Sequence, residues 1–118
     1  MIIVFGSINM DLNIKLKRFP DAGETILSPS YTMTPGGKGA NQAMAAARAG
    51  SKTAIIGKIG DDGPGMRILQ HLKRNEVMTS GVAQSAVFPT GMAMVAKEKD
   101  GDNRTIVASG ANIEVSAD

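Results

Sequence analysis

Residues 34–75, "TPGGKGANQAMAAARAGSKTAIIGKIGDDGPGMRILQHLKRN", contain two helix signals on either side of one strand signal. The alanine-rich run that begins near Gly39 predicts a helix ending at Gly50, because alanine favours helices and glycine suits the position after one. The segment 52–60 is a short apolar run and predicts a buried strand. The segment 61–75 predicts a second helix. Helix, strand and helix in alternation indicate an α/β fold.

The helix expected over 61–75 has a clear start. Pro64 falls near its first turn, where backbone N–H groups have no acceptor within the helix, so the missing N–H of proline costs no hydrogen bond. Asp61 and Asp62 stand just before it and are interpreted as helix-capping residues rather than metal ligands. The apolar stripe of this helix is expected at Met66, Leu69 and Leu72.

The N-terminal segments predict two kinds of strand. The run 1–6, "MIIVFG", is continuously apolar, which predicts a strand buried on both faces at the centre of a mostly parallel sheet. The segment 11–19, "DLNIKLKRF", alternates apolar and polar residues, so it predicts a strand with one solvated face. Its apolar face is formed by Leu12, Ile14 and Leu16.

Two further extended segments complete a second layer. The segment 24–34 is extended but interrupted by Pro29, and 91–110 is expected to form a hairpin turning at the dipeptide 100–101, Asp-Gly. Strands with one apolar face do not belong in the same layer as strands buried on both faces. The sequence therefore predicts an α/β core with a small separate β-sheet, a lid or an interface, whose apolar face rests on a ligand or on a partner subunit.

Composition narrows the function classes. The chain has 118 residues, enough for one domain with its own core, and a formal charge of +2, so no nucleic-acid partner is expected. Because it has no cysteine, neither a disulfide framework nor a thiolate zinc site is possible. The apolar N-terminal run lacks a basic region and is too short for a signal peptide or a membrane span. We therefore expect a cytoplasmic protein with no membrane partner.

The glycine-rich start of the first helix is a candidate ligand site. It fits neither a Walker P-loop nor the dinucleotide fingerprint, because Thr32 and Gln42 stand where those motifs need glycine. Gly37 and Gly39 would still let a ligand approach the backbone, and the side chains at 38 and 41, lysine and asparagine, are hydrogen-bond donors. Such a set suits a hydroxyl-rich or anionic small molecule. Alternatively, the glycines only turn the chain into its helix.

A second polar cluster follows the first buried strand. In the segment 6–11, "GSINMD", Asn9 and Asp11 are expected at the carboxyl end of that strand, where ligands bind in open α/β sheets. Asp11 accepts hydrogen bonds and Asn9 both donates and accepts them, which matches adjacent sugar hydroxyls. Alternatively, both residues only shape a turn.

Several motifs together resemble one family. They are "GSINMD" at 6–11, "FPDAGET" at 19–25, "GGKGANQA" at 36–43, "GKIGDDGPG" at 57–65 and "TGMAMV" at 90–95. In this order they resemble the N-terminal part of the PfkB family of carbohydrate and nucleoside kinases, and within it the ribokinases. The resemblance implies a Rossmann-like sheet with helices on both faces, plus a β-sheet lid over 11–18, 24–34 and 91–109. It implies phosphorylation of ribose with ATP, Mg²⁺ and a monovalent cation, and a homodimer formed through the lids.

By position, the resemblance implies two walls of a sugar site. Asn9 and Asp11 would bind ribose hydroxyls, and the opposite wall would be formed by Gly37, Lys38, Gly39 and Asn41. Lys38 favours the ribokinases over fructokinase-like relatives, which usually lack it.

The sequence departs from the family in one respect. The catalytic aspartate of the family stands in a Gly-Ala-Gly-Asp motif. This sequence contains no such motif, and the segment most similar to it, "SGAN" at 109–112, lacks the aspartate. We therefore expect residues 1–118 to be the N-terminal part of a kinase domain, with its base, nucleotide and cation sites beyond Asp118 and Ser116 as the N-cap of a following helix. The alternative is a non-catalytic sugar- or nucleoside-binding or dimerisation module.

Overall fold

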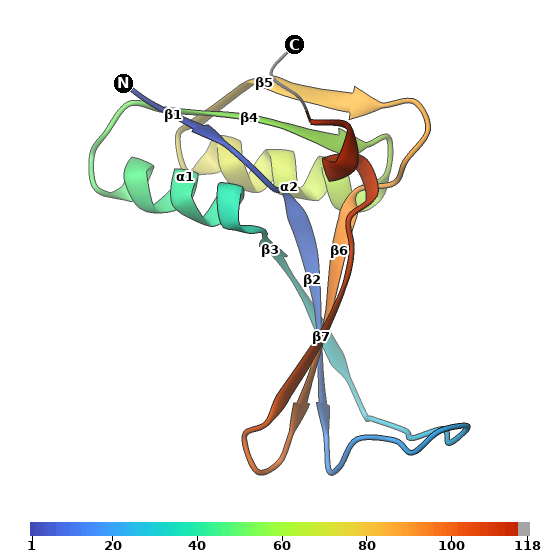
Figure 1. Ribbon diagram of the computed structural model, residues 1–118. Helices are drawn as coiled ribbons and strands as arrows, with labels where there is room; N and C mark the ends of the chain where they lie inside the picture. The colour runs from blue at the N-terminus through green and yellow to red at the C-terminus, as the bar shows by residue number, and fades with distance from the viewer. Residues whose placement is uncertain (116–118) are drawn as a thin grey trace.

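The computed structural model describes residues 1–115, which form two separate β-sheets, two α-helices and a final 3₁₀ helix (Figure 1). The elements in chain order are β1 (Ile2–Phe5), β2 (Asn9–Leu16), β3 (Tyr31–Gly36), α1 (Lys38–Arg48), β4 (Thr53–Gly60), α2 (Gly63–Arg74), β5 (Val77–Ser85), β6 (Gly91–Glu98), β7 (Asn103–Ala108) and η1 (Gly110–Glu114). The α/β architecture with a separate sheet is therefore confirmed. The predicted N-cap at position 116 lies outside the described residues.

The first sheet is parallel, with strand order β1-β4-β5. Both α1 and α2 cover the same face of it, and Ile55 and Ile59 of the central strand are fully buried beneath them (Figure 1). The opposite face carries Ile3 and Phe5, which are 61% and 52% exposed. The prediction of a central strand at 1–6, buried on both faces, is thus wrong within the described residues. Among residues 1–115, β1 pairs with β4 alone, and helices cover only one of its faces.

The second sheet extends away from the helices as a lid, with strand order β3-β2-β6-β7 (Figure 1). β2 runs parallel to β6, while the outer strands are antiparallel to their neighbours. The hairpin predicted at 91–110 is confirmed, and Gly101 in its turn has a φ of 95°. The segment 24–34 differs from the prediction. Residues 24–30 form a loop, and the strand begins only at Tyr31, after Pro29, and continues to Gly36.

Both predicted helices form, with one difference in packing. α1 is followed by Gly50 in a left-handed conformation, φ 93°, as predicted for the residue after a helix. The α2 side chains that are fully buried are Ile68 and Leu72, whereas Met66 is 46% exposed, so the predicted stripe was wrong at that residue. None of the helices within residues 1–115 combines the length and the apolar character needed to cross a membrane.

Candidate functional site

A hollow of about 380 Å³ lies where the lid joins the α/β layer. We call it the hinge hollow. It is lined by Ser7, Asn9, Gly37, Lys38, Asn41, Val107, Ser109 and Asn112. These residues come from the β1–β2 turn with the start of β2, from the start of α1, and from the end of β7 with η1, so three chain segments distant in sequence meet there.

The start of α1 is fixed against the β1–β2 turn by hydrogen bonds to one residue. Ser7 accepts the Lys38 N–H through its hydroxyl and the Ala40 N–H through its carbonyl, both at 3.1 Å. Gly37 precedes the helix with φ 95°, and a Cβ there would lie 2.6 Å from the Ser7 carbonyl oxygen. Gly39 is buried against Gly6, where a Cβ would lie 2.8 Å from the Gly6 Cα. Glycine is therefore needed at both positions for helix and turn to approach so closely.

Asn9 lies in β2 between two glycines in register with it, Gly36 of β3 and Gly91 of β6. A side chain at Gly91 would overlap the Asn9 amide. A side chain at Gly36 would overlap the Asp11 carboxylate, whose Cγ lies 2.6 Å from the position a Cβ would take. The two glycines thus leave space for two polar side chains on one face of the lid.

Asp11 is not among the residues that line the hinge hollow, but it lies on β2 two residues after Asn9, which does line it. Its carboxylate occupies the space above Gly36, one step along the same face of β2 from Asn9. Partial burial raises the pKa of Asp11 above its usual value of 3.8. A carboxylate that has lost part of its hydration binds hydroxyl donors more strongly than one in bulk water.

The sequence thus identified four of the residues that line the hinge hollow: Asn9, Gly37, Lys38 and Asn41. Asp11 and Gly39 are not among the lining residues: Asp11 lies two residues along β2 from Asn9, and Gly39 packs against Gly6. The other four lining residues were missed: Ser7, Val107, Ser109 and Asn112. Ser7 lies within the quoted "GSINMD" motif, but nothing in that motif separates its hydroxyl from an ordinary turn serine. Asn112 meets residues 103 and 104 positions away, and no local pattern can show that.

The start of the lid strand β6 is tied to the α/β layer by Asp62. Its Oδ1 accepts hydrogen bonds from the Thr90 hydroxyl (2.6 Å) and the Gly65 N–H (2.8 Å), and its Oδ2 accepts the Thr90 N–H (2.9 Å). The Thr90 hydroxyl in turn accepts the Gly60 N–H. The predicted helix-capping role of Asp62 is confirmed, and the same carboxylate also positions the lid.

Replacing Asp62 by alanine is expected to lower the free energy of unfolding by about 1–3 kcal/mol, because a helix cap and the partners of buried Thr90 are lost together. Partial burial alone raises the pKa of Asp62, but the hydrogen bonds from Thr90 and Gly65 outweigh this and lower it below 3.8. A lowered pKa stabilises the fold above the unfolded value of about 4 and stops doing so as the pH falls through the folded value. The difference from the unaltered protein should therefore shrink below about pH 4.

Urea unfolding at a series of pH values measures this difference. The matched control is Asp61→Ala, which removes the exposed neighbouring carboxylate. Equal losses of stability in the two variants would contradict the role of Asp62.

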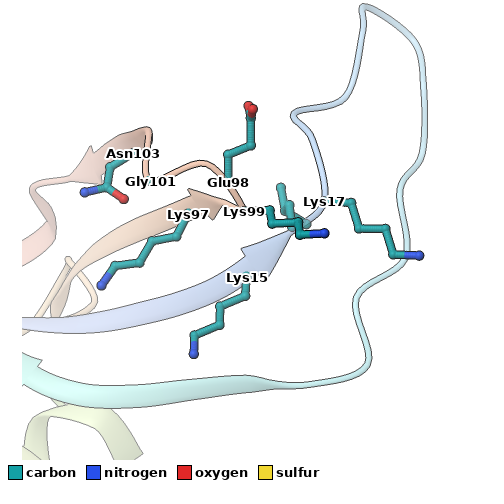
Figure 2. A pocket seen from close by; sticks show the side chains of 8 residues that line it. Lys15, Lys17, Lys97, Glu98, Lys99, Gly101 and Asn103 are labelled. Carbon is teal, nitrogen blue, oxygen red and sulfur yellow. The ribbon is translucent and has the colours of Figure 1, made fainter.

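A larger hollow, of about 630 Å³, lies at the far end of the lid, around four lysines: Lys15, Lys17, Lys97 and Lys99. Figure 2 shows that the ammonium groups of Lys15 and Lys97 point to one side, that those of Lys17 and Lys99 point to the other, and that Glu98 points away from them. Charged groups that diverge cannot hold one small ligand. The hinge hollow, whose lining gathers polar residues from three distant chain segments, is therefore the better candidate site despite its smaller volume.

The donor set of the hinge hollow suits a polyol. Lys38 and Asn41 offer an ammonium group and an amide, and Asp11, on the same strand face as the lining residue Asn9, offers an acceptor. A sugar hydroxyl both donates and accepts, so neighbouring hydroxyls can use both kinds of group at once. Within residues 1–115, no cluster of three or more acidic, histidine or cysteine side chains has the arrangement of a metal site.

Comparison with known families agrees with this geometry. The profile described as pfkB family carbohydrate kinase matches residues 1–118. The chain belongs to the pfkB family of carbohydrate kinases. The resemblance expected from the motifs is therefore confirmed.

Similar proteins within this family are ribokinases. The chain is 44% identical over 114 residues to the ribokinase of Bacillus subtilis and 45% identical over 113 residues to that of Lactococcus lactis. These matches include 97% and 95% of this chain but 39% and 37% of the two ribokinases, so the chain spans well under half of their length. The structure of Arabidopsis thaliana ribokinase complexed with ribose and ATP superposes with a TM-score of 0.86 at 36% identity, over 94% of this chain and 36% of that one.

Proposed function

We propose that this pfkB-family chain forms the sugar-binding part of a kinase that transfers the terminal phosphoryl group of ATP to ribose. The observation that carries the proposal is the hinge hollow, whose lining gathers Asn9, Lys38 and Asn41, with the partly buried carboxylate of Asp11 two residues along β2 from Asn9. The similarity to ribokinases supports ribose as the sugar, and the Arabidopsis thaliana enzyme is one whose structure contains ribose and ATP.

In this proposal each side chain has one task. Asn9 and Asp11, both on β2, form hydrogen bonds with sugar hydroxyls on one side, while Lys38 and Asn41 donate to the oxygens on the other side. Gly37 and Gly39 keep the wall of the site free of side chains, so that the backbone at the start of α1 can approach the sugar. These contacts orient the sugar and exclude water. Orientation supplies a large part of the rate enhancement in phosphoryl transfer.

The base that activates the sugar hydroxyl is proposed to lie outside these 118 residues, because the sequence contains no Gly-Ala-Gly-Asp motif. The nucleotide, Mg²⁺ and a monovalent cation would likewise be bound elsewhere in the protein. The second candidate, a binding module without catalysis, is favoured by the same observation. The two candidates differ in turnover, not in sugar binding.

A coupled assay of ADP release separates them. We expect the protein at its natural length to release ADP from ATP when ribose is present, and the 118-residue chain alone to show no turnover above background. Turnover by the 118-residue chain would contradict the assignment of the base, and no turnover at natural length would favour the binding module.

We also propose that the lid forms a homodimer. One of its faces has a groove of about 740 Å³ whose apolar lining includes Ile14, Leu16, Met94 and Ile106. Of these, Met94 and Ile106 are 45% and 70% exposed. A small sheet cannot bury such a face by itself, and a second copy presents an equal face.

Replacing Ile106 by lysine is expected to weaken this dimer by at least about tenfold, because the interface would then bury an unpaired charge. Sedimentation or light scattering over a range of concentrations measures it. The matched control is Val87→Lys, at a residue that is 77% exposed and lies outside the lid. A monomer at high concentration, or equal behaviour of the two variants, would contradict the lid dimer.

A further inference from the structure

Asn112, on η1, has more side-chain hydrogen bonds than any other residue that lines the hinge hollow. Its Oδ1 accepts the Ile8 N–H at 2.9 Å. Its Nδ2 lies 3.1 Å from the Ile8 carbonyl, 3.0 Å from the Ser109 carbonyl and 2.7 Å from Asn9 Oδ1. The amide of Asn112 therefore pairs with the Ile8 backbone on one side and contacts Asn9 on the other.

The backbone of Ile8 fixes which atom of Asn112 is nitrogen. An N–H group can only donate, so the Asn112 atom facing Ile8 N is the oxygen. Carbonyl oxygens can only accept, so the Asn112 atom facing the Ile8 and Ser109 carbonyls is the nitrogen. Because that nitrogen donates to Asn9, the Asn9 atom it meets must be the oxygen.

The orientation of the Asn9 amide follows from this chain of contacts. With Oδ1 held by Asn112, the Nδ2 group of Asn9 is left as a donor, and among residues 1–115 it donates to no protein acceptor. Asn9 is only 8% exposed, and the hollow it opens on is the hinge hollow. Glycine at position 91 leaves room for the amides of Asn9 and Asn112, because a side chain there would overlap each of them.

We infer that Asn112 is a positioning residue that makes Asn9 a hydrogen-bond donor, and not an acceptor, toward the ligand of the hinge hollow. The inference rests on the proposed function for the identity of that ligand, ribose. The ligand atom that meets Asn9 must then be an oxygen that accepts. Asp11, two residues further along β2, would accept the hydrogen bond that a sugar hydroxyl donates. The site would therefore bind sugar hydroxyls in a fixed orientation, with a ligand oxygen accepting from Asn9 and a ligand hydroxyl donating to Asp11.

A double-mutant cycle on the protein at its natural length tests this. Ribose dissociation constants are measured by titration calorimetry for the unaltered protein, Asn112→Ala, Asn9→Ala and the double variant. We expect Asn112→Ala to weaken ribose binding about fivefold or more, because Asn9 is then free to turn. In the Asn9→Ala background, the same change should alter the constant less than about twofold, since Asn112 acts through Asn9.

Two further variants guard against a loss that only reflects stability. Asn75→Ala is the matched control, because it removes an amide that donates to the His71 carbonyl at the end of α2. It should lower the melting temperature without changing ribose affinity. Asn112→Asp keeps the shape but replaces the donor by an acceptor, so Asn9 would turn its oxygen to the hollow and ribose binding should weaken at least as much.

Three results would overturn the inference. They are unchanged ribose affinity in Asn112→Ala and Asn112→Asp, equal losses in both backgrounds of the cycle, and a loss in Asn75→Ala that matches its fall in stability. In each of these cases the unaltered protein binds ribose and the proposed function stands. Absence of ribose binding by the unaltered protein contradicts the proposed function itself and the inference with it.

Discussion

Replacing Gly37 by alanine is expected to abolish most ribose binding and to lower the free energy of unfolding by at least about 2 kcal/mol. Gly37 has a φ of 95°, where a side chain costs about 1–3 kcal/mol. A Cβ would also lie 2.6 Å from the Ser7 carbonyl oxygen and 3.0 Å from Asn9 N. To relieve these contacts the start of α1 must move away from the β1–β2 turn, which separates the two walls of the hinge hollow.

Gly101→Ala is the matched control for this change. Gly101 also has a φ of 95°, but no atom lies within 4 Å of the place a Cβ would take. Alanine at position 101 should therefore cost a similar backbone strain energy but cause no steric clash, and it lies in a turn far from the hinge hollow. Urea unfolding and ribose titration on both variants measure the contrast. Equal stability losses together with unchanged ribose affinity in Gly37→Ala would show that the close approach of helix and turn is unimportant.

The parts of the fold that the sequence predicts are those with strong local signals. α1 has an alanine run and a terminal glycine, and the lid hairpin turns at an Asp-Gly dipeptide. β5 was not predicted, since "VMTSGVAQS" at 77–85 neither alternates regularly nor is continuously apolar. This strand forms because it pairs with β4, and pairing between distant segments is not a local property.

The exposure of β1 shows a second limit. An apolar run predicts a buried strand, but burial also requires other elements that cover the strand. Within the described residues, β1 has a neighbouring strand on one side and helices on one face (Figure 1). Met66 shows the same limit for a helix. The helical period allows more than one apolar stripe on α2, and the one that packs inward contains Ile68 and Leu72 rather than Met66.

The candidate site was partly predictable for a similar reason. Asn9, Lys38 and Asn41 stand beside glycine-rich turns, a local signal for exposed polar groups. Asn112 has no such signal, because its role depends on contact with Ile8 across almost the whole chain. Gly36 and Gly91 make room for polar side chains of β2 because they lie in register with Asn9. That register is set by the pairing of the lid strands and cannot be read from the local sequence.

Replacing Asp11 by asparagine is expected to raise the ribose dissociation constant about ten- to a hundredfold. Hydrogen bonds to an ionised carboxylate contribute roughly 1.5–3 kcal/mol each, and about 1.4 kcal/mol corresponds to a factor of ten. Asparagine keeps the shape above Gly36 but exchanges one acceptor oxygen for an N–H₂ group that would face sugar donors. ATP affinity should remain the same. Asn41→Ala should act in the same direction as Asp11→Asn.

The pH dependence of this loss identifies the carboxylate as its cause. Ribose binding that needs the ionised form is strong above the pKa of Asp11 and weakens as the pH falls through it. Because burial raises that pKa above 3.8, the weakening should begin at a higher pH than an exposed aspartate would give, and Asp11→Asn should not show it. Asp100→Asn, in the exposed turn of the lid hairpin, is the control and should leave both the affinity and its pH profile unchanged. Calorimetric titration with ribose across the acidic range measures all three proteins. An Asp11→Asn variant with the affinity of the unaltered protein would show that this carboxylate only shapes the strand.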